Sequence, residues 1–450
     1  MRKQSFDSVV RVRTRRQPGQ FAAVAGAVAA EKGLLGDILT IRMGEDDTVR
    51  DVTVEAEDDA HLARIVAAIR AVAGVEVMQV IDPVFETHRG GKLHMTSRVR
   101  LERLQDLRHV YTPGVARVVR AIEREPERAR EWTGLGNSVG IFTNGTRVLG
   151  LGNVGPLASL PVMEGKAVLY DAFAGISAVP MLVDTTDPDE FIETVVRLAP
   201  SFGGIHLEDI RVPDCFRIES ELIRRLSRPV MHDDQHGTAV AALAAVINAC
   251  VRTGLSLKAA TLGQIGLGAA GSAIARLAGA YGVGRVLVTD VDTTAMARAQ
   301  AEGAEPCDLP TLLATADIVI ATTGRPGLIR PQDVRPGQVI FSLSNPEPEI
   351  DPAEALAAGA ALAFDGRSIN NALAFPGLFK AALEVQSRSI SREMMVAAAE
   401  AIAAWAGPDE VVPSPLDLGV HGAVTRAVAA CARQQGLAGT ARLQGSAPLA

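Results

Sequence analysis

A glycine run constrains the fold of this chain more than any other segment. Gly266, Gly268 and Gly271 follow a short apolar stretch, 259–265, and open an apolar pattern of helical period at 269–281. Small residues at these positions permit a sharp turn from strand to helix and a close approach of the backbone to a ligand. Further short apolar stretches, separated by helical patterns, follow at 286–289, 318–321, 339–343 and 361–364. This alternation predicts an α/β domain built on a doubly wound parallel sheet.

An acidic residue after the next predicted strand extends this pattern. Asp290 lies 290 − 266 = 24 residues beyond the first glycine, close to the spacing of about 20 in Rossmann-type dinucleotide-binding units, where such a carboxylate binds the adenosine ribose. We expect NAD, because a carboxylate would repel the 2′-phosphate of NADP. NADP stays an alternative because of Arg298 in the following helix. The predicted cofactor-binding residues are Gly266, Gly268, Ala269, Ala270, Gly271 and Asp290.

Two acidic pairs, Glu208-Asp209 and Asp233-Asp234, each follow a short apolar segment. Like charges at close range raise each other's pKa, so four carboxylates come together at high cost unless a cation neutralises them. Carboxylate oxygens are the ligands that hard divalent cations prefer. The pairs therefore predict a Mg²⁺ or Mn²⁺ site.

The second pair lies between His232 and His236, and the segment also resembles the H-E-x-x-H zinc motif. Two features weigh against zinc. Asp233 stands where the zinc motif has its glutamate base, and residues 229–231 have the character of a strand, which places the acids in a strand-end loop. Zinc is therefore the less favoured alternative.

The composition limits the classes of function. At 450 residues, 48% of them hydrophobic, the chain is large enough for two or three domains. Its 45 basic and 52 acidic residues are mixed along the sequence and give a net charge of −7, so we expect no nucleic-acid partner. No apolar run approaches the roughly 18 residues of a membrane span, and the scattered cysteines predict reduced thiols. We expect a cytoplasmic protein with no membrane partner.

Residues 1–84 form a predicted domain of their own. Their apolar patterns predict strands at 9–14, 38–43, 52–56 and 75–81 and helices at 21–31 and 59–71. The order βαββαβ is ferredoxin-like and resembles the ACT domain, a regulatory or dimerisation module that binds small ligands near its first strand–helix turn, here residues 16–19. The alternative is a packing domain that binds nothing.

Motifs along the rest of the chain carry a more specific resemblance. They are Y-T-P-G-V-A at 111–116, F-T-N-G-T-R-V-L-G-L-G-N-V-G at 142–155, P-V-M-E-G-K at 161–166, H-L-E-D-I at 206–210, H-D-D-Q-H-G-T-A at 232–239, S-N-P-E-P-E at 344–349 and N-N-A-L-A-F-P-G at 370–377. In this order they resemble the bacterial NAD-dependent malic enzymes, over about 86–404. The resemblance implies a mixed α/β catalytic domain at 85–235 and the NAD domain at 236–435. Residues 436–450 are rich in Gly, Ala and Gln without a period, which predicts a loose tail.

The same resemblance assigns roles to individual residues. It implies Lys166 as the base that takes the hydroxyl proton of malate, and we expect burial and the adjacent cation to depress its pKa so that it is neutral. It implies Tyr111 as the acid that protonates the enol and Asp233 as an orienting or proton-relay carboxylate. The implied metal ligands are Glu208, Asp209 and Asp234, and the implied substrate contacts are Arg147, Asn345 and Asn371, with Asn345 also beside the cofactor.

The implied function is oxidative decarboxylation of malate to pyruvate and CO₂ with reduction of NAD. A homo-oligomer, either a dimer or a tetramer, is expected, with a small-molecule effector at the ACT-like domain. Two alternatives stay open: a malolactic enzyme, which converts malate to lactate, and a ligand-sensing protein on a disused enzyme scaffold.

Overall fold

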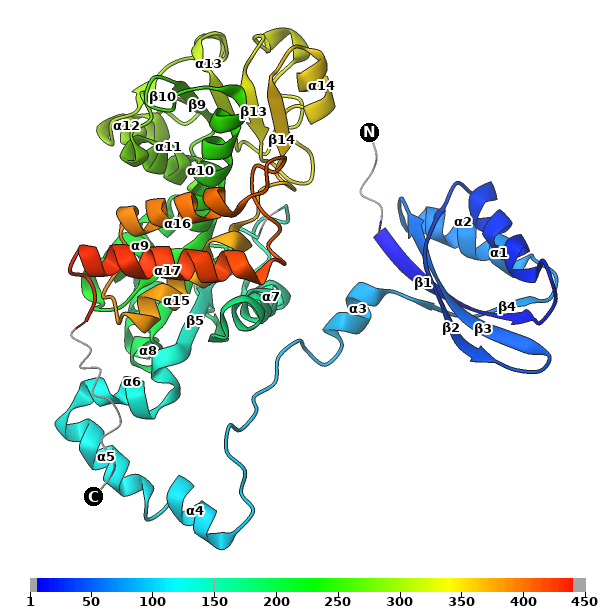
Figure 1. Cartoon of the computed structure of the whole chain (residues 1–450), viewed down its shortest axis with the longest axis horizontal. Helices are drawn as coiled ribbons and strands as arrows, with labels where there is room; N and C mark the ends of the chain where they lie inside the picture. Colours follow the sequence, from blue (N-terminus) through cyan, green and yellow to red (C-terminus); the bar gives the residue numbers. More distant parts are fainter. Residues whose placement is uncertain (1–5, 149, 440–450) are drawn as a thin grey trace. The chain divides into compact units, whose positions relative to one another are not determined.

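The computed structural model describes residues 6–148 and 150–439, and the chain divides into two compact units (Figure 1). The first unit ends at His94 and the second begins at Met95. Of the predicted tail, 436–450, the part from 440 onward lies outside the described residues. None of the helices in the described ranges is long and apolar enough to cross a bilayer.

The first unit is an antiparallel sheet with two helices packed on one face. Its elements follow the predicted βαββαβ order: β1 (Phe6–Arg15), α1 (Gln20–Ala30), β2 (Leu34–Met43), β3 (Asp47–Ala56), α2 (Asp59–Arg70) and β4 (Val75–Ile81). The sheet order β2-β3-β1-β4 is the ferredoxin-like arrangement. Alternate residues of β1 point into the core under the helices, because side chains along a strand alternate between its faces. A short helix, α3 (Pro83–His88), follows.

The second unit contains two parallel sheets. The smaller sheet has the order β6-β5-β7-β8, with β5 (Ser138–Thr143), β6 (Ser177–Leu182), β7 (Gly204–Leu207) and β8 (Val230–His232). Helices α7 (Pro156–Ala174), α8 (Pro188–Leu198) and α9 (Asp214–Arg225) connect these strands, as parallel pairing requires. Because the four strands run the same way, the acids that follow β7 and β8 meet at one edge of the sheet.

The larger sheet has six parallel strands in the order β11-β10-β9-β12-β13-β14. Its strands are β9 (Thr261–Ile265), β10 (Arg285–Thr289), β11 (Glu305–Pro306), β12 (Ile318–Ala321), β13 (Val339–Ser342) and β14 (Leu362–Asp365), and its helices are α11 (Ala269–Tyr281), α12 (Thr293–Ala301), α13 (Leu309–Thr315) and α14 (Pro352–Ala357). This is the Rossmann strand order, and it confirms the predicted doubly wound sheet. The order reverses between β9 and β12, where such sheets bind their ligands.

Helix α10 (Asp233–Thr253) leads from the smaller sheet to the larger one without a break. The predicted boundary between residues 235 and 236 falls in its first turn, because the acidic pair and a long apolar stretch of the core belong to one continuous helix. Three C-terminal helices pack on α10 or on each other: α15 (Phe375–Glu384), α16 (Arg392–Trp405) and α17 (Leu418–Gln434).

The segment before the smaller sheet carries three short helices, α4 (Leu104–Val110), α5 (Val115–Arg124) and α6 (Ala129–Trp132). Helices α4 and α5 extend away from the two sheets of their unit (Figure 1), and neither has a buried residue. Short 3-10 turns complete the described elements: η1 (Pro126–Arg128), η2 (Gly134–Asn137), η3 (Ala199–Ser201), η4 (Pro331–Asp333) and η5 (Asn371–Leu373).

Candidate functional site

The two acidic pairs meet where β7 and β8 end. Glu208 and Asp209 directly follow β7, and Asp233 and Asp234 are the first residues of α10. Carboxylate oxygens of Glu208, Asp209 and Asp234 lie within 4.8 Å of one another. The Asp209 amide donates a hydrogen bond of 2.9 Å to Asp234 Oδ2. Asp209 has a left-handed backbone, with φ 54°, and such strained residues are retained mainly at functional sites.

Burial makes this cluster electrostatically unfavourable. Burial, reinforced by the charge of Asp234, raises the pKa of both Glu208 and Asp209 to about 8. Burial likewise raises the pKa of Asp233 to about 6. Asp209 Oδ2 is buried without a hydrogen-bond partner among the described residues. An all-oxygen set with a buried, unpartnered oxygen fits a hard divalent cation, which favours ionised carboxylates.

Lys166 faces the cluster from helix α7. Its Nζ lies 2.5 Å from Asp233 Oδ2 and 3.1 Å from Glu208 Oε1, and it lies over the ring of Phe375, 4.8 Å from the centroid. Burial disfavours the ammonium, but the charges of Asp233, Glu208 and Asp234 outweigh burial and raise the pKa of Lys166. Among the side chains alone the shift is opposite to the predicted depression, which also depends on the adjacent cation.

A second set of potential ligand atoms overlaps the first and consists of His206, Glu208 and Asp233. These groups already bind each other or Lys166: His206 Nε2 lies 2.5 Å from Glu208 Oε2, and Lys166 Nζ bridges Glu208 and Asp233. Sequence reasoning did not single out His206. The signal was its place two residues before Glu208 at the end of a strand, because residues i and i+2 of a strand share a face.

The histidines around the second acidic pair have separate environments, which argues against the zinc alternative. His232 ends β8, outside the helix, whereas His236 Nε2 lies 2.9 Å from Glu219 Oε2 on α9. Glu219 also accepts hydrogen bonds from the His232 amide and the Gln235 side chain. The predicted strand-end loop is wrong, because α10 starts directly at Asp233. The acids thus lie at a helix N-terminus, where the helix dipole favours negative charge.

The glycine run forms the turn between β9 and α11, where the strand order of the larger sheet reverses. Gly266 has φ 87°, and a Cβ on Gly271 would lie 1.9 Å from the Gly266 carbonyl oxygen, so both positions require glycine. Asp290 accepts hydrogen bonds from the Leu267 amide at 2.5 Å and from the Asp292 amide at 2.8 Å. Its carboxylate therefore ties the glycine turn to the end of β10.

The remaining predicted cofactor residues begin helix α11. Gly268 is the N-cap, and Ala269 and Ala270 are the first two helical residues; the free amides of such a helix start suit a phosphate group. Arg298, on α12, lies over the ring of Phe216 of α9, with its Cζ 4.3 Å from the centroid. The structure thus holds Arg298 against the helix that precedes β8.

Two of the predicted substrate-binding residues lie at the acidic cluster. Arg147, in the loop after β5, donates its amide to the Asp209 carbonyl oxygen at 3.0 Å. Asn371 lies against the first turn of α10. A Cβ added to Gly237 would lie 3.2 Å from Asn371 Cβ and would also meet the Asp233 carboxylate, so the three residues are neighbours. The loop after β5, the end of β7 and the start of α10 therefore converge on one place.

The third predicted substrate residue, Asn345, lies in the loop after β13. That loop is anchored by the buried carboxylate of Glu349, which accepts hydrogen bonds from the Thr323 amide at 2.6 Å, the Thr323 hydroxyl at 2.8 Å and the Ser344 hydroxyl at 2.5 Å. Glu349 thus joins the loops after β12 and β13. It is the last residue of the S-N-P-E-P-E motif, and the motif alone gave no sign of its burial.

Tyr111 is the predicted residue that the structure leaves outside the site. It lies at the end of α4 with 67% of its surface exposed, and α4 packs mainly on α5. Figure 1 shows both helices apart from α7 and α10, which carry Lys166 and the second acidic pair. Within one chain, Tyr111 and Lys166 are not brought together.

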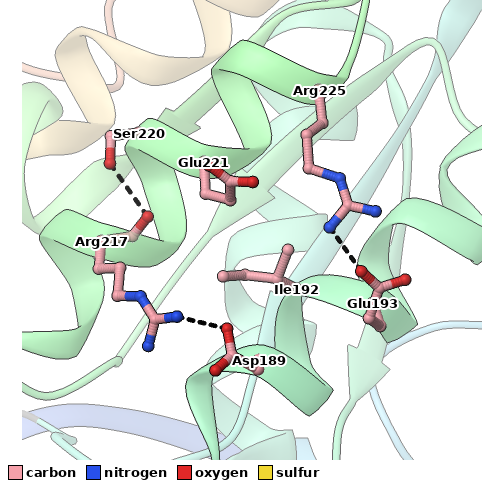
Figure 2. A pocket seen from close by; sticks show the side chains of 7 residues that line it. All are labelled: Asp189, Ile192, Glu193, Arg217, Ser220, Glu221 and Arg225. Carbon is pink, nitrogen blue, oxygen red and sulfur yellow. Dashed lines mark hydrogen bonds and ion pairs between the residues drawn. The ribbon is translucent and has the colours of Figure 1, made fainter.

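A separate groove of about 250 Å³ lies between α8 and α9. Figure 2 shows its lining residues, which are Asp189, Ile192, Glu193, Arg217, Ser220, Glu221 and Arg225. Its arginines are already paired, Arg217 with Asp189 and Arg225 with Glu193. The acidic cluster contributes no residue to it. Glu221, the remaining acid of the groove, pairs with Arg224 on the same helix. Since every charged side chain of this groove already has a partner, we place the candidate site at the acidic cluster.

Two protein-family models match this chain. The family model described as "Malic enzyme, N-terminal domain" matches residues 91–187 and 185–223. A second model, "D-isomer specific 2-hydroxyacid dehydrogenase, NAD binding domain", matches residues 231–325. The first match spans Lys166 and the first acidic pair, and the second spans the second acidic pair and the glycine run.

Relatives match nearly the whole chain. The sequence is 52% identical to NAD-dependent malic enzyme 1 of Bacillus subtilis (strain 168) over 413 residues. This alignment covers 91% of this chain and 94% of the relative. It is 38% identical to the NAD-dependent malic enzyme of Geobacillus stearothermophilus, over 96% of each chain. The crystal structure of malic enzyme from Pyrococcus horikoshii Ot3 matches with a TM-score of 0.75 and 39% identity, over 79% of this chain and 91% of that chain.

Proposed function

The chain belongs to the malic enzyme family, and on that premise we propose how its residues carry out the reaction. It converts malate to pyruvate and CO₂ and reduces NAD. One observation carries this conclusion: 52% identity to an NAD-dependent malic enzyme along 91% of the chain. The malolactic alternative is not favoured, because NAD-dependent relatives that match nearly the whole chain, those of Bacillus subtilis and Geobacillus stearothermophilus, are malic enzymes.

Glu208, Asp209 and Asp234 would hold a Mg²⁺ or Mn²⁺ ion. The all-oxygen set and the unpartnered Asp209 Oδ2 support this assignment. Bound there, the cation would stabilise the negative charge that develops on the substrate during decarboxylation. The three ligands come from the end of β7 and the start of α10, two rigid elements that fix their spacing.

Lys166 would take the hydroxyl proton of malate in the oxidation, for which NAD, when bound, would supply the hydride acceptor. The amine must be neutral for this step, and carboxylates that share a cation attract the ammonium less and so lower its pKa. Asp233, whose Oδ2 lies 2.5 Å from Nζ, orients the amine and is the adjacent group that can exchange its proton.

Malate carries two carboxylates, so groups on more than one loop must hold it. Arg147 would bind one carboxylate through two parallel hydrogen bonds, and Asn371 would add an amide from beside the cluster. Asn345, at the carboxyl end of β13, would contact the substrate and the nicotinamide end of the cofactor. The proximity of Arg147 and Asn371 to the acids supports this division.

NAD would lie across the carboxyl end of the larger sheet. The pyrophosphate would bind at the N-terminus of α11, where the glycine turn leaves room for it. The Asp290 carboxylate has lone pairs that the two backbone amides do not use, and one of these would accept a hydrogen bond from the ribose. These contacts favour NAD, and the turnover ratio between NAD and NADP measures how strongly.

Tyr111 would protonate the enol at carbon after CO₂ leaves. Because this residue is exposed within one chain, we propose a homo-oligomer in which a second copy supplies it. Helices α4 and α5 support this proposal, since they expose apolar side chains that a partner would cover: Leu104, Leu107, Val110, Val118 and Val119, each 37–74% exposed.

The first unit would be a regulatory or dimerisation domain of the ACT type. Its ferredoxin-like sheet supports this proposal, and so does β2, which exposes a row of apolar side chains, Leu34, Leu35, Ile38, Leu39, Ile41 and Met43. An effector would bind near the turn at residues 16–19. The alternative, a packing domain that binds nothing, makes a different prediction when the unit is removed.

Malate turnover by metal-stripped enzyme tests the proposed function. We expect no activity in excess chelator and recovery with Mn²⁺, because the cation would stabilise the negative charge that develops during decarboxylation. One NADH should form for each pyruvate. Lactate without net NADH would instead identify a malolactic enzyme, and no turnover under any condition would identify a sensing protein. Full activity in excess chelator would overturn the metal site.

A further inference from the structure

Both carboxylate oxygens of Glu208 have defined partners. Oε1 lies 3.1 Å from Lys166 Nζ, and Oε2 lies 2.5 Å from His206 Nε2. On the other side of the imidazole ring, His206 Nδ1 lies 2.8 Å from the hydroxyl of Tyr170. Tyr170, His206 and Glu208 therefore form a chain of hydrogen bonds that ends at the acidic cluster.

The direction of this chain follows from its acceptor. With the divalent cation of the proposed function bound, Glu208 is ionised and only accepts hydrogen bonds, so Nε2 carries the imidazole proton and Nδ1 accepts from the Tyr170 hydroxyl. Full burial is consistent with two uncharged groups, because apolar surroundings disfavour charge. Both donors point toward Glu208, and each hydrogen bond polarises the next.

Aromatic rings enclose the chain. Tyr170 and His206 are fully buried, and helix α15 covers them with Phe375, 4.8 Å from Tyr170 between centroids, and Phe379, 5.9 Å from His206. In such apolar surroundings an unpaired polar atom is costly. If Glu208 rotated away, the Nε2 proton would lose its acceptor, so the enclosure keeps the carboxylate in one orientation.

Helix α7 holds Glu208 at both oxygens. Lys166 and Tyr170 are four residues apart on this helix and so lie on the same face. Lys166 reaches Glu208 Oε1 directly, whereas Tyr170 reaches Oε2 through His206. One helix thus sets the position of the base and the orientation of a carboxylate beside it.

We propose that His206, held by Tyr170, is a positioning residue that fixes Glu208 so that Oε1 faces Lys166 and the divalent cation. This inference rests on the metal site of the proposed function. Partners that orient a ligand in this way typically change metal affinity by about 10–100-fold when they are removed. This chain of hydrogen bonds predicts that Mn²⁺ affinity depends on His206 and Tyr170, which are not ligands.

Mn²⁺ binding, measured by the electron paramagnetic resonance signal of the free ion, tests the inference without any assay of activity. His206→Asn places its amide near Nδ1, out of reach of Glu208, and should weaken Mn²⁺ binding by about 10–100-fold. His206→Gln places an amide nitrogen near Nε2 and should retain most of the affinity. Tyr170→Phe keeps the ring and removes only the hydroxyl, and should give a smaller loss than His206→Asn.

His61 provides a matched control in the first unit. It is also buried, and both of its ring nitrogens have hydrogen-bond partners, the Glu57 amide at 3.1 Å and the Glu31 carbonyl at 2.7 Å. His61→Asn should lower the unfolding temperature and leave Mn²⁺ affinity unchanged. The comparison separates loss of a buried histidine from loss of the hydrogen bond to Glu208.

Unchanged Mn²⁺ affinity in folded His206→Asn and Tyr170→Phe would overturn the inference and leave these residues a packing role. An equal loss in His206→Gln and His206→Asn would also overturn it, because the effect would then not depend on a donor at Nε2. If His206→Asn does not fold, Tyr170→Phe decides. An unaltered chain that binds no Mn²⁺ would instead overturn the metal site of the proposed function.

Discussion

At the scale of single residues, the site depends on one ammonium enclosed by acids. The short contacts of Lys166 with Asp233 and Glu208 hold Nζ in place, and the same contacts oppose its loss of a proton. A base in this position works only when the surrounding negative charge is shared with another cation. The metal ligands and the base are therefore one electrostatic unit.

Substituting the proposed base or the proposed acid should slow turnover strongly. We expect Lys166→Ala and Tyr111→Phe each to lower kcat by roughly 10²–10⁴-fold, the usual contribution of a positioned base or acid. The measurement is NADH formation from malate with saturating Mn²⁺. Tyr281→Phe, a tyrosine of α11, and Lys258→Ala, an exposed lysine, serve as controls and should retain wild-type turnover.

Co-expression of the two variants reports where Tyr111 acts. If a second copy supplies Tyr111 and the two variant chains pair at random in equal amounts, half of the dimers are hybrids. One of the two sites in each hybrid has both residues intact, so the mixture should recover roughly a quarter of wild-type turnover. No recovery above the separate variants would place Tyr111 in the same chain as its Lys166 and contradict the proposed assembly.

The motifs name the chemically active residues but not their partners. Lys166 and the four acids could be predicted because their residue types and order are themselves the signal. Tyr170 could not, because its role depends on His206, 36 residues later in the sequence. The rise in the Lys166 pKa among the side chains alone has the same origin, since it depends on which carboxylates the fold brings to one ammonium.

At the scale of elements, the first turn of α10 is shaped around a carboxylate. Gly237 lies one turn after Asp233, and a Cβ on Gly237 would lie 1.8 Å from Asp233 Oδ1. Glycine within a helix costs about 1 kcal/mol of stability relative to alanine. Here the missing side chain provides the space in which the Asp233 carboxylate faces Lys166.

Gly237→Ala should therefore damage catalysis while the helix itself is strengthened. The added methyl group displaces Asp233, and a misplacement of about 1 Å can cost about 10²-fold in rate. Gly279→Ala is the matched control, because no atom lies within 4 Å of a Cβ there, and it should raise stability by about 0.5–1 kcal/mol with unchanged kinetics. The measurements are kcat and urea unfolding; wild-type kcat in Gly237→Ala would contradict the steric argument.

Local patterns predicted the regular elements well where the pattern was strong. The structure has β12 and α11 at the predicted residues, and β9 and β10 within two residues of their predicted ends. The start of α10 was missed because two acids, a glutamine, a histidine and a glycine give no apolar period. The two-residue strand β11 (Glu305–Pro306) was missed because it is too short to carry a pattern.

At the scale of the whole molecule, the first unit holds none of the proposed catalytic, metal-binding or cofactor-binding residues. A chain that begins at Met95 should therefore fold and oxidise malate, since it keeps both parallel sheets and α4 to α6. We expect a change in assembly size or in the response to small metabolites, because β2 exposes apolar side chains that another copy would cover. Light scattering and kinetics with and without a metabolite panel measure both.

The packing-domain alternative makes the opposite prediction for the same truncation. It requires that the shortened enzyme keep the oligomeric state and kinetics of the full chain. It also requires that residues 1–94, expressed alone, neither self-associate nor bind any of a panel of amino acids and central metabolites. Both results together would end the regulatory proposal.

The unbroken course of α10 also limits how this enzyme can be recombined. A chimera that replaces the larger sheet to change the coenzyme would, at a junction near residue 235, detach Asp233 and Asp234 from the helix that positions them. A chimera keeps Asp233 and Asp234 on their own helix only when its junction lies before Val230 or beyond Gly254. The segment that can be exchanged is therefore the larger sheet without α10, or the larger sheet together with all of α10 and its two acids.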